Sequence, residues 1–166
     1  MSIFPTKILL ATDGSKEATD AARTAVDLAE ISSSELYIVH VWEPLPLLVS
    51  SYGSLAYTDS EAVQTMLEQA ESQAREILDE QVEHIKNMGG TVRESYLRQG
   101  HPDQEIVRLA EEIGAGLIVM GSRGLGGMRR VLMGSVSDSV VHHAHCPVLV
   151  IRGENKASSH EGFYTP

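Results

Sequence analysis

The segment from Met120 to Ser137, MGSRGLGGMRRVLMGSVS, combines residue types that could hold a phosphorylated ligand. It contains three arginines, five glycines and no acidic residue, although the whole chain has a formal net charge of −10. Glycines leave backbone N–H groups unshielded, and such groups can surround an anion where the chain turns sharply. The arginine guanidinium groups add positive charge. This composition therefore predicts a loop that binds a polyanion.

Four residues of this segment have a spacing that joins the loop to the start of a helix. Gly121, Gly124, Gly134 and Ser135 form the pattern G-x2-G-x9-G-S. The last two begin a predicted helix, whose N-terminal amides and partial positive charge favour phosphate. The structural alternative is a capping box, in which Ser135 and Asp138 only cap that helix. The segment is neither a P-loop nor a G-x-G-x-x-G fingerprint after the first strand, so those two explanations are excluded.

Further candidate positions follow the first and second predicted strands. Asp13 ends the run ATD, and the pair His40-Val41 closes the second apolar run. In open α/β sheets, ligands bind beyond the carboxyl ends of the strands, where the glycine segment also begins. An Asx turn, in which the Asp13 side chain bonds its own backbone, is the alternative for that residue. We therefore expect Asp13, Val41 and the glycine segment to share one edge of a sheet.

Short apolar runs alternate with helical patterns along the chain. The predicted strands are Lys7–Ala11, Leu36–Val41, Thr91–Leu97, Leu117–Met120 and Val148–Ile151. Helices are expected after Ser15, from Ser60 to Met88, from Pro102, and from Ser135 to Ala144. The apolar rhythm of the long helix begins at Val63 and Met66. Repeated strand–helix–strand units predict an α/β fold, with a mainly parallel five-stranded sheet and helices on both faces.

The length of 166 residues is typical of one domain, which we expect to span residues 1–152. Residues 43–59 form a long and rather apolar connection. Such a connection could be a lid or contact surface, or it could pack on its own domain. Residues 153–166 contain too few apolar side chains to anchor them, and we expect a flexible tail.

Composition limits the classes of partner and compartment. The negative net charge argues against general affinity for nucleic acid or for acidic membrane surfaces. A single cysteine, Cys146, excludes an internal disulfide framework and fits a reducing compartment. No apolar run has the length of a signal-peptide core or of a membrane span. The sequence therefore predicts a soluble, cytoplasmic domain.

The run His142-His143-Ala144-His145-Cys146 resembles a metal-binding cluster at first sight. Structural zinc sites usually need four ligands, and no second pair of ligands with suitable spacing occurs elsewhere in the sequence. Histidines in the last turn of a helix are also favoured by the helix dipole. We therefore predict no metal site and an unreactive, buried thiol.

The glycine pattern and the segments around it resemble the ATP-binding branch of the universal stress protein family. The matching segments are KILLATDGS at the start, HV at 40–41, QGHPDQEIV at 99–107, LIVMGSRG, and GSVSDSVVHHAHCPVLVIR. The resemblance covers almost the whole chain except the 43–59 loop and the tail. It implies an adenine nucleotide alpha hydrolase-like, Rossmann-like fold with strand order 3-2-1-4-5.

The resemblance also implies a set of nucleotide-contacting positions. These are Ala11, Thr12, Asp13, Val41, Met120, Gly121, Arg123, Gly124, Gly134, Ser135 and Val136. Asp13 would bind the ribose hydroxyls or adenine, and the Val41 backbone would pair with adenine. Ala11 and Thr12 would line the base pocket. The positions from Gly124 onward would surround the phosphates, and Met120 and Gly121 would contact the ribose. The motif does not fix where Arg123, Arg129 and Arg130 point.

By this resemblance the chain would bind ATP, with Mg²⁺ arriving on the nucleotide, and act as a nucleotide-dependent stress-response regulator. A slow ATPase or phosphoryl-transfer enzyme is the alternative. Fast phosphoryl transfer needs positioned metal and nucleophile-orienting groups. The motif offers only Asp138 nearby, so binding is favoured over turnover. A third possibility, an interaction module with an empty pocket, is disfavoured because the glycines are present.

The last predicted strand, Val148–Ile151, would lie at an edge of the sheet in the family's strand order. An exposed apolar edge invites pairing with another strand. The resemblance implies a homodimer joined through this strand.

Overall fold

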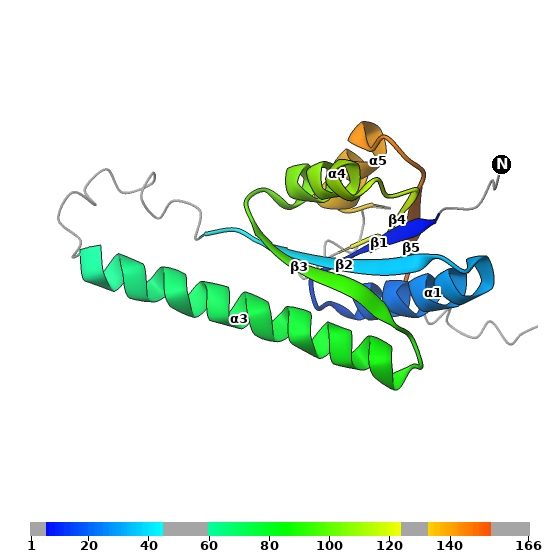
Figure 1. Cartoon of the computed structure of the whole chain (residues 1–166). Helices are drawn as coiled ribbons and strands as arrows, with labels where there is room; N and C mark the ends of the chain where they lie inside the picture. The colour runs from blue at the N-terminus through cyan, green and yellow to red at the C-terminus, as the bar shows by residue number, and fades with distance from the viewer. Residues whose placement is uncertain (1–5, 45–59, 124–132, 154–166) are drawn as a thin grey trace, which may run out of the picture.

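Five strands form one sheet in the order β3-β2-β1-β4-β5, and every neighbouring pair is parallel (Figure 1). The computed structural model describes residues 6–44, 60–123 and 133–153. The strands are β1 (Lys7–Thr12), β2 (Glu35–Trp42), β3 (Val92–Gln99), β4 (Leu117–Gly121) and β5 (Val148–Ile151). The predicted strand order is confirmed, and each predicted strand lies within two residues of the observed bounds. Most of the 43–59 connection and of the tail lies outside the described residues.

The helices cover both faces of the sheet, as the repeated units predict (Figure 1). α1 (Lys16–Ser32) and α3 (Ser60–Asn87) lie on one face, and α4 (Pro102–Ile113) and α5 (Ser135–His143) lie on the other. Ser15 caps α1, because its Oγ accepts a hydrogen bond from the Ala18 N–H at 3.2 Å. α1 therefore begins at the carboxyl edge of the sheet, directly after β1.

The three central strands are apolar on both sides, because helices cover both sides. Leu10, Ile38 and Val119 pack toward α1 and α3, whereas Leu9, Val39 and Ile118 pack toward α4. All six are fully buried, and each such side chain contributes about 1.5–3 kcal/mol relative to exposure. These two apolar layers hold the strand ends in a fixed relation to one another.

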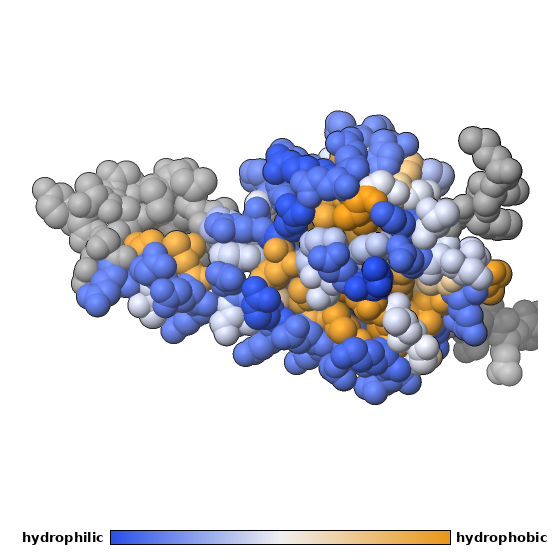
Figure 2. Space-filling view, viewed as in Figure 1, coloured by the Kyte–Doolittle hydropathy of each residue, from blue (hydrophilic) through white to orange (hydrophobic). Residues whose placement is uncertain are grey.

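The helix α3 extends past the sheet at its N-terminal end (Figure 1). Its 28 residues make it about 42 Å long at 1.5 Å per residue. Its buried residues, such as Ala74, Leu78 and Ile85, all lie in the second half of the helix. Val63 and Met66 are 40% and 50% exposed, and Figure 2 shows apolar surface near that end of the helix. Their apolar rhythm therefore does not mark a core face, because the sheet does not reach that far.

No helix in the described part of the chain has both the length and the apolar character that a membrane span requires.

Candidate functional site

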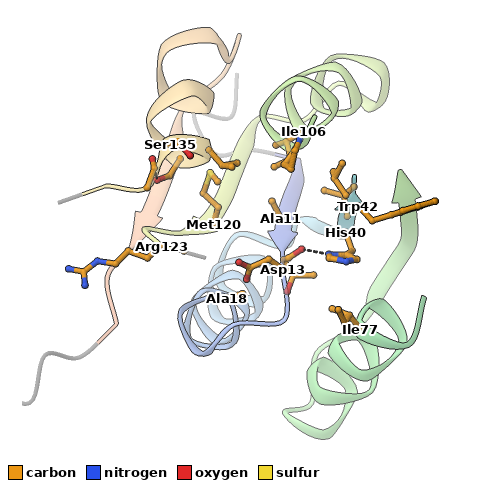
Figure 3. A pocket seen from close by; sticks show the side chains of 18 of the residues that line it. Ala11, Asp13, Ala18, His40, Trp42, Ile77, Ile106, Met120, Arg123 and Ser135 are labelled. Carbon is orange, nitrogen blue, oxygen red and sulfur yellow. Dashed lines mark hydrogen bonds between the residues drawn. The ribbon is translucent and has the colours of Figure 1, made fainter. Parts of the chain in front are cut away.

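The carboxyl ends of β1, β2 and β4 open into a cavity of about 1460 Å³ (Figure 3). Its walls come from α3, α4 and α5, which stand on both sides of the strand ends. Small-ligand sites usually measure about 300–1,000 Å³, so a nucleotide fits. All nucleotide-contacting positions predicted within the described residues line this cavity. Gly124, Arg129 and Arg130 lie outside the described residues.

The turn between β1 and α1 holds Asp13 in place. The Asp13 carboxylate Oδ1 accepts a hydrogen bond from the Ser15 N–H at 2.9 Å, and the Gly14 N–H donates to Thr12 Oγ1 at 3.2 Å. This is the Asx turn that the sequence offered as the structural alternative. The turn and a ligand role are compatible, because the Asp13 side chain also lines the cavity.

Val41 is the first residue of β2 after the last paired position of β1 and β2. The Glu35 N–H donates to Thr6 O, so the odd-numbered residues of β2 direct their backbone groups toward β1. The β1–β2 pairing ends at Thr12 and His40. If the ladder continued, the Gly14 N–H would donate to the Val41 carbonyl. It donates to Thr12 Oγ1 instead. The Val41 carbonyl therefore faces the cavity edge, where a ligand amino group could donate to it.

The N-terminus of α5 forms the opposite end of the cavity. Gly134 is the N-cap residue, with φ −73° and ψ 162°, and no side chain among the described residues caps this end. Its N–H donates to Ser122 O at 2.6 Å, and the Asp138 N–H donates to Gly134 O at 3.0 Å. Between them lie the first helical amides, beginning at Ser135, which a helix leaves unpaired and which carry partial positive charge.

The capping box considered for Ser135 and Asp138 is wrong. Ser135 is the first residue inside the helix, not the residue before it. The hydroxyl that braces this helix start belongs to Ser137, which donates to Ser122 O at 3.0 Å and to Gly134 O at 3.1 Å. The Ser135 side chain is thus not required for capping.

At two positions of the glycine motif, close packing against neighbouring backbone leaves little room for a side chain, which the sequence did not reveal. A Cβ atom at Gly121 would lie 3.0 Å from the Glu17 Cβ and 3.1 Å from the Glu17 carbonyl carbon, so β4 passes directly against α1. A Cβ atom at Gly134 would lie 3.2 Å from Ser122 O, where the segment before α5 crosses the end of β4. Both glycines bring helix starts close to the strand ends, whether or not they also face a ligand.

The charge of the described lining is mixed. Arg123 lines the cavity, but its guanidinium group extends away from Asp13 and His40 (Figure 3). Asp13, Glu43 and Asp138 also line it. Within the described lining, Arg123 is the only lysine or arginine, and the starts of α4 and α5 add partial positive charge.

Several lining residues were not predicted. Ile77 of α3 and Ile106 of α4 lie opposite the strand ends, where they give the cavity apolar walls (Figure 3). Each lies in an amphipathic helical pattern, which from sequence alone predicts a core residue. His40 is different, because a histidine inside the apolar strand ELYIVHVW was a visible signal.

The helices α4 and α5, which lie on the same face of the sheet, are joined by a hydrogen bond. The Ser139 hydroxyl donates to Asp103 Oδ2 at 2.6 Å, which links α5 to the first turn of α4. This hydrogen bond holds the pKa of the Asp103 carboxyl below its usual value. The ionised carboxylate thus helps to fix the helix whose N-terminus faces the cavity.

The histidine run near the C-terminal end of α5 bonds to backbone carbonyls. His142 Nδ1 donates to Asp138 O at 2.7 Å, and His143 Nδ1 donates to Ser139 O at 2.8 Å. His145 Nε2 donates to Ala115 O at 3.0 Å. The described residues contain no group of three or more side chains placed to hold a metal ion. Cys146 is only partly buried, which corrects the predicted buried thiol, and desolvation still raises the pKa of this thiol.

Comparison with known proteins agrees with this geometry. The model of the universal stress protein family matches residues 5–152. Universal stress protein YxiE of Bacillus subtilis is 34% identical over 146 residues, which are 88% of this chain and 98% of the relative.

Solved structures lead to the same group. The universal stress protein UspA from Lactobacillus plantarum has a TM-score of 0.75 and 26% identity, over 91% of this chain and all of that chain. A universal stress protein in complex with cAMP has a TM-score of 0.63 and 27% identity, over 89% and 96% of the two chains. One from Archaeoglobus fulgidus in complex with dAMP has a TM-score of 0.58 and 25% identity, over 90% and 99%. By sequence and by fold, this chain belongs to the universal stress protein family.

Proposed function

We propose that this protein binds ATP in the cavity at the strand ends and acts in the cytoplasm as a nucleotide-dependent regulator of the stress response. The observation that carries the proposal is the N-terminus of α5, which no side chain among the described residues caps, at one end of the cavity, with Asp13 and Val41 at the other end. Complexes of relatives with cAMP and dAMP support an adenine nucleotide as the ligand class.

The nucleoside would lie at the ends of β1 and β2. The Val41 carbonyl would accept from the adenine amino group, and the Asp13 carboxylate would accept from ribose hydroxyls or adenine. Ala11 and Thr12 would form the floor of the base pocket. Met120 and Gly121, at the end of the neighbouring strand β4, would contact the ribose.

The phosphates would lie at the start of α5. The amides of Ser135 and Val136 would donate to phosphate oxygens, with Arg123 and the segment from Gly124 to Gly134 completing the site. Mg²⁺ would be held mainly by the phosphates, in keeping with its preference for phosphate oxygens and water.

Binding is favoured over catalysis by the groups at the phosphate end. Efficient phosphoryl transfer needs a residue that orients the attacking nucleophile. On α5, the carboxylate that lines the cavity is that of Asp138, and this side chain is 61% exposed. An exposed carboxylate is poorly held for that task, so the proposed role is a ligand-dependent change of partners or shape.

The test is to identify what the purified protein carries. Protein purified without added nucleotide is denatured, and the released small molecules are identified by mass spectrometry. We expect ATP, at up to one molecule per chain. The refolded, nucleotide-free protein is then mixed with ATP and Mg²⁺ in less than equimolar amount, and ADP is followed over minutes. Stoichiometric conversion to ADP in that time would favour the slow ATPase instead.

We also propose a homodimer joined through β5. The two edges of the sheet differ in kind: β3 carries charged residues such as Arg93 and Glu94, whereas β5 reads VLVI. Charged side chains protect an edge strand from pairing, and an apolar edge invites it. The contrast between the edges supports β5 as the dimer strand.

Substitution of Val150 by proline should separate the dimer into single chains. Ile118 N–H donates to Pro147 O and Ser122 N–H donates to Ile151 O, so residues 147, 149 and 151 bond to β4. Val150 lies between them and directs its N–H to the free edge. Proline at this position removes that donor and leaves the β4–β5 bonds in place. Light scattering after size-exclusion chromatography should show the mass falling by half.

The matched control is Ser95→Pro on the opposite edge. The Gly100 N–H donates to Trp42 O, so the even-numbered residues at this end of β3 face β2 and Ser95 faces outward. This variant should keep the wild-type mass. Equal masses for Val150→Pro and wild type would contradict the β5 dimer.

A further inference from the structure

A buried histidine stands at the end of the cavity assigned to the nucleoside. His40 of β2 is 6% exposed and lines the cavity beside Thr12 and Asp13 (Figure 3). Its neighbours along the strand on either side, Val39 and Val41, are apolar. A polar ring in such a strand is costly unless it makes hydrogen bonds.

Within the described residues the His40 ring makes one hydrogen-bond contact, and that contact fixes which ring nitrogen carries a hydrogen. His40 Nδ1 lies 2.8 Å from Thr12 O, within the buried part of the sheet. A carbonyl oxygen can only accept, so Nδ1 must carry the hydrogen. In the neutral ring, Nε2 then holds a lone pair. The contact thus selects the Nδ1–H tautomer.

This bond reaches the β1–α1 turn from a different strand. Within the turn, the Gly14 N–H bonds Thr12 Oγ1 and the Ser15 N–H bonds Asp13 Oδ1, and both are local contacts. The His40 bond instead ties Thr12 to β2, in the row where Thr12 and His40 pair. It therefore links the position of Asp13 to that of Val41, the next residue after His40.

We propose that His40 is a positioning residue of the nucleoside end: its Nδ1–H bond to Thr12 O holds Asp13 and the Val41 carbonyl at the separation that an adenine nucleoside requires. This inference rests on the proposed nucleotide binding. In this proposal His40 does not contact the phosphates, which would lie at the start of α5.

Two substitutions separate the hydrogen bond from the volume of the ring. His40→Leu fills a similar space without a donor, and His40→Asn retains an N–H donor near the position of Nδ1. Loss of one neutral hydrogen bond predicts that His40→Leu binds adenosine and ATP about 3- to 10-fold more weakly. His40→Asn should return both affinities to within about twofold of wild type, since it keeps the bond. Binding of inorganic triphosphate should be the same in all three proteins.

The tautomer provides a readout that does not depend on ligand or on folding of a variant. In ¹⁵N NMR of the wild-type protein, His40 Nδ1 should show the shift of a protonated nitrogen, because a carbonyl oxygen can only accept. An unprotonated Nδ1 would overturn the proposal. So would unchanged adenosine affinity in His40→Leu, or an Asn variant as weak as the Leu variant. If wild type itself binds neither adenosine nor ATP, the proposed function fails, and the NMR result still decides whether the His40 bond exists.

Discussion

Proline in place of Ser135 should weaken ATP binding by about 10- to 100-fold while leaving α5 intact. Ser135 is the first helical residue, the position where proline is best tolerated. Gly134 already has the extended conformation, φ −73° and ψ 162°, that a residue before proline adopts. The substitution therefore removes one backbone N–H together with the Ser135 hydroxyl, and it leaves the helix geometry in place. A hydrogen bond to a charged group contributes about 1.5–3 kcal/mol, which gives the expected range.

The matched control is Ser135→Ala, which removes the hydroxyl and keeps the amide. We expect it to bind ATP more nearly as wild type does than Ser135→Pro, because it keeps every backbone amide that is proposed to hold the phosphates. Calorimetry with ATP and with adenosine separates effects on phosphate binding from effects on nucleoside binding. Ser135→Pro should bind adenosine normally. If it binds ATP as tightly as wild type, with unchanged circular dichroism, the start of α5 does not hold the phosphates.

Replacement of Asp13 should weaken both ATP and adenosine. Asp13→Asn keeps an oxygen that can accept from the Ser15 N–H, so the turn should survive and only the charge is lost. We expect about a 10-fold loss of affinity for either ligand, because a charged acceptor is replaced by a neutral one. Asp13→Ala also removes the turn contact and should lose about 100-fold.

The thermal midpoint separates the two effects of Asp13. Asp13→Asn should melt within a few degrees of wild type, whereas Asp13→Ala should melt lower, because the Asx turn that precedes α1 is lost. An Asn variant that binds adenosine as wild type does would show that the carboxylate serves the turn alone.

The fold was largely predictable, because its signals are local and repeated. The strand patterns, the Ser15 cap and the start of α4 at Pro102 all depend on neighbouring residues. Strand order came from the family resemblance. The convergence of Asp13, Val41 and Ser135 on one cavity followed from the rule that parallel strands end at the same edge.

The errors arise where a residue's role depends on distant contacts. The start of α5 is set by Ser137 bonding to Ser122, and no sequence spacing distinguishes this from a cap at Ser135. The exposure of Val63 depends on where the sheet ends beneath α3. The contact of Gly121 with Glu17 joins segments more than one hundred residues apart, so the glycine could be interpreted from sequence only as a loop residue.

The most direct test is calorimetric titration of nucleotide-free wild-type protein with ATP and Mg²⁺, alongside adenosine. The account predicts one site per chain for both ligands. Because the phosphates add charge-assisted bonds at α5, ATP should bind at least about 10-fold more tightly than adenosine. Equal affinities would contradict the phosphate assignment, and the absence of any heat of binding with ATP would contradict the nucleotide site as a whole.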